Sequence, residues 1–188
     1  SDVEGDDIGV IGSGLGDTGL ARRPASAAVV GRNSLAREAV ANAATIAGFP
    51  VRLNEESLYR DIFELAPALG MVLKKGRAGV YIWGGEPVIT LPETPGFGGR
   101  NQSLALAMGC EISGTYNVSV IVAGTDGSDG PTDYAGAIVD GDTVTDIDVA
   151  RSSLNAADAG TFLGATGSLF KTGPTGTNVL DLVIALVE

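Results

Sequence analysis

The stretch "NVSVIVAG" (117–124) constrains the fold of this chain more than any other segment. Valine and isoleucine dominate it, as is typical of a strand that is buried on both faces of a parallel sheet. Elsewhere along the chain, strand-like runs alternate with alanine-rich helical patterns. Such alternation is typical of α/β proteins. We therefore predict an α/β fold with a layered sheet of mostly parallel strands flanked by helices.

The remaining elements follow from local periodicity and turn residues. Strands are expected at 27–31, 50–54, 78–86, 87–93 and 180–187, and helices at 35–48, 57–75, 103–112 and 149–167. The first two strands and the helix between them would form one βαβ unit, with a right-handed crossover between parallel strands. The run "AIVDGDTV" (137–144) predicts a hairpin around Asp140 and Gly141, because Asp-Gly favours a tight two-residue turn.

The composition excludes several classes of chemistry. The chain has no histidine, so it cannot by itself form a Ser-His-Asp triad or a histidine-ligated zinc site. Its formal charge of −11 argues against binding to nucleic acid or to anionic membranes, because both need basic surfaces. The single cysteine, Cys110, cannot form an internal disulfide and fits a reducing compartment. No stretch is apolar for long enough to span a membrane, and we expect a cytoplasmic protein.

Four glycine-rich polar loops lie next to apolar segments: "GGE" (84–86), "GFGGRNQ" (96–102), "GTDGSDGPTD" (124–133) and "TGPTGTN" (172–178). In open α/β sheets, ligands bind beyond the carboxyl ends of strands, so these loops are candidate binding elements. The residues "GGRNQ" open a helix, whose backbone N–H groups together with Arg100 suit a carboxylate or a phosphate. Asp126, Asp129 and Asp133 suit Mg²⁺, which prefers oxygen ligands, or a proton acceptor for a substrate hydroxyl.

Each loop also has a purely structural interpretation. The three aspartates are equally typical of Asx turns in a long loop, Arg100 of a surface ion pair, and "TGPTGTN" of ordinary turns. The run "DGDTVTDID" (140–148) is interpreted as a solvated hairpin rather than as a metal site. The segment "GLGDTG" (14–19) matches G-x-G-x-x-G, but Pro24 follows where a helix should continue. We interpret it as a turn-rich loop rather than as a dinucleotide fingerprint.

These loops and their flanks, taken in order, resemble the type II glycerate kinase family. Members of that family carry a C-terminal domain called MOFRL and are often named hydroxypyruvate reductases. The segments that carry the resemblance are "SDVEGDD", "GGE", "GGRNQ", "GTDGSDGPTDYAGAIVDG" and "TGPTGTNVLDL". The motifs "GTDGSDGPTD" and "TGPTGTN" are long and specific. The resemblance covers most of the chain and is strongest from Gly79 onward.

The resemblance implies a kinase that phosphorylates D-glycerate at its 2-hydroxyl to give 2-phosphoglycerate, with ATP and Mg²⁺ as cofactors. It also implies two α/β domains with the active site between them, of which this chain would be the C-terminal portion. Residues 1–26 would be a lead-in from the missing N-terminal domain, 27–78 a βαβ unit that joins the domains, and 79–188 the MOFRL-like α/β domain. The expected partners are D-glycerate or a related 2-hydroxy acid and the missing N-terminal domain or chain. A homodimer is one expected assembly.

The resemblance also assigns roles to individual residues. Arg100, Asp126 and Asp133 are the catalytic candidates, and Arg100 would bind the substrate carboxylate or the transferred phosphate. Asp126 and Asp129 are the candidate metal ligands. The residues expected to bind substrate or phosphate are Gly98, Gly99, Asn101, Thr172, Gly173, Thr175, Gly176, Thr177 and Asn178.

Departures from the family pattern leave two alternatives to the kinase open. Ser103 stands where "GGRNQE" usually has an acid, and Leu180 and Val183 replace the amide and the arginine of "TNVNDLR". These losses favour a non-catalytic small-acid-binding protein or a degenerate family member, whereas the intact aspartate and threonine loops favour the kinase. The other alternative is a hydroxypyruvate reductase, which would need a better nucleotide fingerprint than "GLGDTG".

Overall fold

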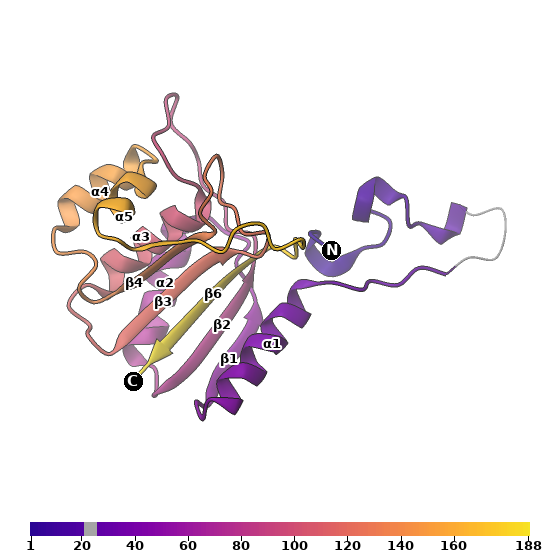
Figure 1. Ribbon diagram of the computed structural model, residues 1–188, viewed down its shortest axis with the longest axis horizontal. Helices are drawn as coiled ribbons and strands as arrows, with labels where there is room; N and C mark the ends of the chain where they lie inside the picture. The colour runs from indigo at the N-terminus through magenta and orange to yellow at the C-terminus, as the bar shows by residue number, and fades with distance from the viewer. Residues whose placement is uncertain (21–25) are drawn as a thin grey trace.

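The computed structural model describes residues 1–20 and 26–188 and shows one mixed sheet with helices on both faces (Figure 1). The six strands have the spatial order β1-β2-β6-β3-β4-β5. Their bounds are β1 (Val51–Glu56), β2 (Gly79–Gly85), β3 (Val118–Gly124), β4 (Gly136–Asp140), β5 (Leu169–Phe170) and β6 (Asp181–Val187). The predicted α/β class is confirmed. Residues 21–25 of the lead-in segment, which include Pro24, lie outside the described residues.

The prediction of mostly parallel strands is wrong. Within the described residues, β1 and β2 are the one parallel pair. Strand β6 lies between β2 and β3 and is antiparallel to both, and β4 is antiparallel to β3. The error has a physical cause. The run is rich in β-branched residues, but only alternate residues of β3 are fully buried. One-sided burial of this kind is typical of an antiparallel strand.

Three other predicted elements are also wrong. Residues 27–31 form no strand: they pair with none of the six strands, and Ala27, Ala28 and Val30 are exposed. Residues 87–93 contribute a single bridge from Val88 to Asp61, since prolines on both sides interrupt the ladder. The hairpin at Asp140 is instead a turn, in which the Asp140 Oδ1 atom accepts hydrogen bonds from the N–H groups of Asp142 and Thr143.

The helices agree better with the sequence pattern. Their bounds are α1 (Asn33–Ile46), α2 (Ile62–Lys75), α3 (Arg100–Ile112), α4 (Ile147–Asn155) and α5 (Ala159–Ala165). Asp61 begins α2 because its carboxylate accepts the Phe63 N–H at 2.9 Å, and Asp146 begins α4 in the same way. The actual βαβ unit is therefore β1-α2-β2, one helix later in the chain than predicted.

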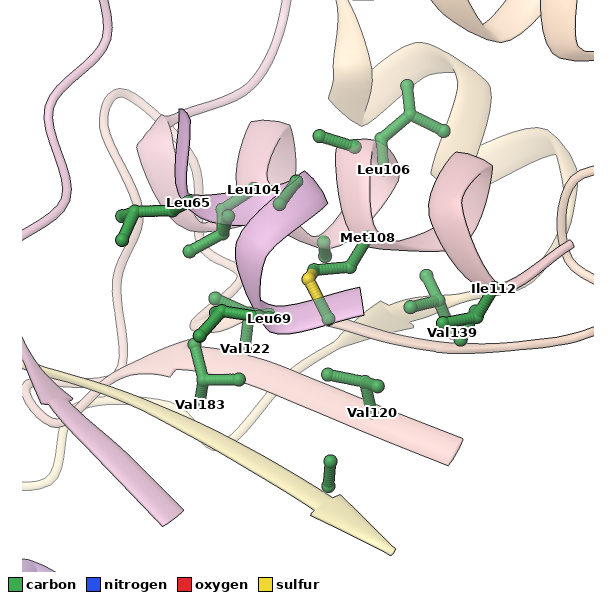
Figure 2. Packing of buried hydrophobic residues seen from close by; sticks show 14 of the residues in the cluster. Leu65, Leu69, Leu104, Leu106, Met108, Ile112, Val120, Val122, Val139 and Val183 are labelled. Atoms are coloured by element: carbon green, nitrogen blue, oxygen red, sulfur yellow. The ribbon is translucent and has the colours of Figure 1, made fainter. Parts of the chain in front are cut away.

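The main core lies between the sheet and helices α2 and α3. Leu69 of α2 and Met108 of α3 pack over Val120, Val122 and Val183 of the central strands (Figure 2). Helix α3 is buried along almost its whole length. This packing fixes the position of its N-terminus at the end of the sheet where β6 begins. Helix α1 packs on the opposite face, against β1 and β2 (Figure 1).

The N-terminal segment lies away from this body as a series of short 3₁₀ turns at Glu4–Asp6, Ile11–Gly14 and Thr18–Leu20 (Figure 1). The "GLGDTG" stretch falls within these turns and follows no strand. None of the helices in the described residues is both long and apolar enough to cross a membrane. Strands β1 and β2, on either side of the predicted boundary at 78/79, pair in one sheet. The division of the chain into domains stays a prediction.

Candidate functional site

The N-terminus of α3 is capped by a carboxylate from a distant loop. The Asp129 Oδ1 atom accepts the Asn101 N–H at 3.0 Å, and its Oδ2 atom accepts the Gln102 N–H at 2.8 Å. Asp129 is only 3% exposed. A Cβ atom on Gly99 would overlap the Asp129 carboxylate, and Gly98 has a positive φ of 139°. Both glycines are therefore needed for this close approach.

Burial raises the pKa of Asp129 to about 6. The two backbone N–H groups lower it, because they stabilise the ionised form, and the nearby Asp181 carboxylate raises it further. Both oxygens of Asp129 already accept a hydrogen bond from α3. The structure thus gives this side chain a capping role, and its predicted role as a metal ligand remains untested.

Arg100, the first residue of α3, lies between two carboxylates. Its Nε donates to Asp181 Oδ2 at 2.7 Å, and its Nη1 is 2.7 Å from Glu86 Oε1. The Asn101 side-chain Nδ2 donates to the other oxygen of Asp181 at 3.0 Å. Burial lowers the pKa of Arg100, but Asp181 and Glu86 together raise it above its ordinary value, so the guanidinium is a permanent cation.

The sheet topology explains why these side chains meet. Asp181 begins β6 and lies in register with Gly85, which ends β2, and with Gly124, which ends β3. Because β6 is antiparallel to β2 and β3, its first residue lies beside the last residues of these two strands. Asp181 is 3% exposed, and its burial raises its pKa, although Asn101 and Arg100 oppose that shift.

These residues line a cavity of about 440 Å³ at the edge of the sheet. One wall is apolar and comes from the segment after β2 and the turn before α5. It consists of Ile89, Leu91, Pro95 and Ala157. The other wall is polar and consists of Arg100, Asn101, Ser103, Asp126, Ser128, Asp129, Asn178 and Asp181. The polar wall combines one cation with three carboxylates. One apolar wall and a few convergent polar groups are typical of a small-molecule site.

The structure brings two of the three predicted aspartates to this cavity. Asp126 lines it, and its carboxylate accepts the Ser128 N–H at 2.9 Å and the Ser128 hydroxyl at 3.1 Å in an Asx turn. The Asp133 side chain is 90% exposed, lies 3.7 Å from Lys171 and does not line the cavity. In residues 1–20 and 26–188, no group of three or more acidic, cysteine or histidine side chains could hold a metal ion.

The 172–178 loop packs against the aspartate loop rather than facing it across the cavity. The Thr175 hydroxyl donates to the Thr125 carbonyl at 2.6 Å, and the Thr175 N–H donates to the Asp126 carbonyl at 3.2 Å. Asn178 lines the cavity. Gly173 instead borders a separate hollow of about 360 Å³ beside Lys171. The other four predicted binding residues of this loop, Thr172, Thr175, Gly176 and Thr177, line neither hollow.

Two residues of the site escaped the sequence analysis. Asp181 was interpreted only as part of a strand, and Glu86 only as part of a polar turn. A carboxylate at the start of the apolar run 181–187 was the available signal for Asp181, because a buried acid needs a partner. Glu86 offers no such signal, since its contact with Arg100 depends on how distant segments meet.

A buried network supports the cavity from the other side of the sheet. The Asn33 side-chain Nδ2 donates to the carbonyls of Val179 at 2.8 Å and Asp181 at 3.2 Å. The Asn33 Oδ1 atom accepts a hydrogen bond from the Arg37 Nε at 2.9 Å. The Arg37 Nη2 atom forms an ion pair with Oε2 of Glu56 in β1 at 3.1 Å. Helix α1 thus fixes the backbone on which Asp181 lies.

The fold and this cavity define an α/β protein with a small-molecule-type site beside the N-terminus of α3. The sequence profile of the MOFRL family matches residues 79–181, which is more than half of the chain. The chain therefore belongs to the MOFRL family.

Named relatives agree with this assignment. The chain is 45% identical over 119 residues to "D-glycerate 2-kinase" from Thermotoga maritima, covering 61% of this chain and 28% of the relative. It is 34% identical over 174 residues to "Glycerate 2-kinase" from Pyrococcus horikoshii, covering 85% of this chain and 39% of that protein.

Its fold matches the crystal structure of a glycerate kinase from Thermotoga maritima with a TM-score of 0.87 and 30% identity. That match covers 100% of this chain and 56% of the other. The chain thus spans less than half the length of the curated relatives and about half that of the solved chain.

Proposed function

We propose that this chain is the C-terminal part of a kinase that phosphorylates D-glycerate at its 2-hydroxyl. The observation that carries the proposal is the position of Arg100 in the cavity wall, at the N-terminus of α3 and beside the Asp126 loop. A guanidinium at a helix N-terminus suits the carboxylate of a small acid or a phosphoryl group. The names of the relatives support a glycerate substrate.

In this proposal, the chain's own residues bind and orient rather than form covalent bonds with the substrate. Phosphoryl transfer depends mainly on positioning and on neutralisation of negative charge. Arg100 would hold the anionic group of the substrate, while its contact with buried Asp181 keeps the guanidinium in place. The apolar wall around Ile89 and Leu91 would exclude water from one side of the substrate.

ATP and Mg²⁺ are the cofactors that this activity requires. Magnesium is commonly held by one or two carboxylates together with substrate phosphates, and it would neutralise phosphate charge. Asp126 fits such a role best in this chain, because it lines the cavity and is partly exposed, whereas Asp129 is buried and caps α3 with both oxygens. These carboxylates suit a metal ion that binds together with the nucleotide rather than one that protein ligands alone surround.

A non-catalytic small-acid-binding protein is the second candidate, and one contact favours it. Ser103 replaces the acid of the family pattern and lines the cavity, but its hydroxyl donates to the Gly99 carbonyl at 2.8 Å within α3. This position thus adds no carboxylate to the cavity. The reductase alternative has less support, because "GLGDTG" (14–19) lies in 3₁₀ turns without the preceding strand that a nucleotide fingerprint requires.

The remaining expectations belong to the whole protein. We propose a cytoplasmic enzyme whose second domain or chain completes the site, and a homodimer as its assembly. Relatives longer than this chain support the second domain.

The variant Arg100→Ala tests the kinase proposal in the longest natural polypeptide that contains this chain. We expect it to raise KM for D-glycerate and to lower kcat, because a charged contact to the substrate is lost. The matched control is Lys171→Ala, which removes an exposed cation that does not line the cavity. Kinetics of Arg100→Ala equal to those of the control, in a variant that melts normally, would remove Arg100 from the site.

A further inference from the structure

Leu180, the residue before Asp181, has a backbone conformation that leucine rarely adopts. Its φ angle is 67°, in the left-handed region. There the Cβ atom of any residue other than glycine comes too close to the following carbonyl oxygen, so a bulky residue with a positive φ is an outlier. Leu180 is also only 4% exposed. The strain therefore lies inside the protein, next to the carboxylate that accepts the Arg100 Nε.

Hydrogen bonds hold the backbone on both sides of this strained residue. The Thr125 Oγ1 atom accepts the Val179 N–H at 2.8 Å and donates to the Leu180 carbonyl at 2.7 Å. The Thr125 N–H donates to the same carbonyl at 3.1 Å, and the Asn178 Oδ1 atom accepts the Leu180 N–H at 3.1 Å. A strained conformation persists only where the surrounding structure fixes it more than once. Thr125 supplies three of these four bonds.

The conformation of Leu180 decides where the Asp181 side chain lies. Asp181 follows directly and begins β6, so a rotation of Leu180 towards an unstrained conformation would turn the Asp181 carboxylate away from α3. That carboxylate accepts the Arg100 Nε at 2.7 Å and the Asn101 Nδ2 at 3.0 Å. The direction of the cation in the cavity wall thus depends on a strained residue that itself touches no substrate.

We propose that Thr125 is a positioning residue for this cavity. Its hydroxyl keeps Leu180 in the left-handed conformation, Leu180 places Asp181, and Asp181 holds the Arg100 guanidinium in the cavity wall. Thr125 does not line the cavity, so it acts through these residues and not by contact with a ligand. The inference rests on the proposed function in one respect, since it takes Arg100 as the group that binds the substrate.

The test follows the Arg100 Nε–H group by NMR in the longest natural polypeptide that contains this chain. A hydrogen bond to a buried carboxylate protects this proton from exchange with water. The variant Arg100→Lys assigns the signal, because lysine has no guanidinium. We expect a slowly exchanging signal in the wild-type protein and in Thr125→Ser, which keeps the hydroxyl. A wild-type protein without a protected signal overturns the inference.

The variant Thr125→Val removes the hydroxyl and nearly keeps the shape of the side chain. We expect exchange of the Arg100 Nε–H to become faster, and the Kd for D-glycerate to rise, each by about tenfold. Calorimetric titration measures the Kd. The matched control is Thr143→Val, which removes a hydroxyl that also donates and accepts within a turn but lies outside the cavity. The control should keep both wild-type values, and wild-type exchange in Thr125→Val overturns the inference.

A second substitution separates positioning from a general loss of stability. Asparagine tolerates a positive φ better than leucine does, so Leu180→Asn makes the segment less dependent on the hydroxyl. We expect the double variant Thr125→Val with Leu180→Asn to recover slow exchange at Arg100, although it lacks both the hydroxyl and a buried leucine. A hydroxyl that only stabilised the fold would give two additive losses. Exchange in the double variant as fast as in Thr125→Val therefore overturns the inference.

The variant Leu180→Ile decides the matter if Thr125→Val does not fold. It keeps the number of carbon atoms and every hydrogen-bonding group of Thr125. It adds a branch at Cβ, which makes a positive φ still less favourable. We expect faster exchange of the Arg100 Nε–H in this variant, and exchange at the wild-type rate overturns the inference.

The two readouts separate this inference from the kinase proposal. A protein whose Arg100 signal responds to Thr125→Val as expected, but which neither binds D-glycerate nor releases ADP from ATP, contradicts the kinase and supports the inference. A protein that phosphorylates D-glycerate, with the same Kd and the same Arg100 exchange in Thr125→Val as in the wild type, supports the kinase and contradicts the inference.

Discussion

Asp129 is a buried carboxylate whose two oxygens accept the N–H groups of Asn101 and Gln102. Because a helix N-terminus carries partial positive charge, a carboxylate there is stabilised. Burial opposes this stabilisation and raises the pKa of Asp129 to about 6. The carboxylate of Asp129 therefore holds the N-terminus of α3, including Arg100, and gains or loses its proton near pH 6.

This equilibrium predicts how Asp129 affects stability against pH. The pKa in the folded protein lies above the value of about 3.9 in an unfolded chain, so between these two values the folded state binds more protons. The free energy of unfolding contributed by Asp129 must then fall as pH rises through this window, by at most about 1.4 kcal/mol per pH unit.

Urea unfolding of the wild-type protein and of Asp129→Asn, with EDTA present, measures this contribution from about pH 4.5 to pH 7. We expect the variant to be less stable than the wild type, by a margin that is larger at the acid end than at pH 7. Two stability curves that run parallel across this range would contradict the assigned titration.

At the scale of elements, local patterns predicted the helices and the central strands but not which segments pair. Helix α3 and strands β3 and β6 appear where periodicity and β-branched runs predicted them. The direction of β6 relative to β3 was not predictable, because β-branched runs occur in strands of either direction. Residues 27–31 have a composition that suits a strand, but they pair with none of the six strands, and composition does not show pairing.

The two glycine-rich loops at the cavity form one packed unit. Gly127 has a positive φ of 88°, and a Cβ atom there would collide with the Gly173 carbonyl. Gly173 also has a positive φ, of 72°, but a Cβ atom on it would meet no other atom within 4 Å. An alanine at either position would therefore strain the backbone, but only an alanine at Gly127 would also collide with a neighbouring atom.

We predict that Gly127→Ala destabilises the protein more than Gly173→Ala does, by about 1–3 kcal/mol. The difference should be accompanied by faster proteolytic cleavage within residues 171–178, because the collision displaces this loop. Thermal unfolding and limited proteolysis of the two variants measure both effects. Equal melting temperatures for the two variants would show that the loops do not depend on this contact.

At the scale of the whole molecule, the site forms because three distant segments reach one edge of the sheet. Arg100, Asn101, Asp126 and Asp129 were candidates from the sequence, since glycine-rich motifs mark them. Asp181 was not, because its importance depends on its register with β2 and β3. Asp133 had the same motif support but points into solvent. Motifs thus indicate which loops matter, whereas the sheet decides which side chains in them meet.

The charge of the cavity bears on the proposed shared active site. Among the described residues that line the cavity, the one cation is Arg100, and the relatives of the chain are longer. A kinase must also bind the nucleotide phosphates, which needs further positive groups or metal ions. We therefore infer that this chain supplies the acid-binding half of a shared active site.

The most direct test measures ADP release from ATP with Mg²⁺ and D-glycerate, on this chain alone and on the longest natural polypeptide that contains it. We predict glycerate-dependent release from the longer form only. Release by this chain alone would contradict a shared site. Release by neither form would contradict the kinase itself and leave the binding of a small hydroxy acid as the function of this cavity.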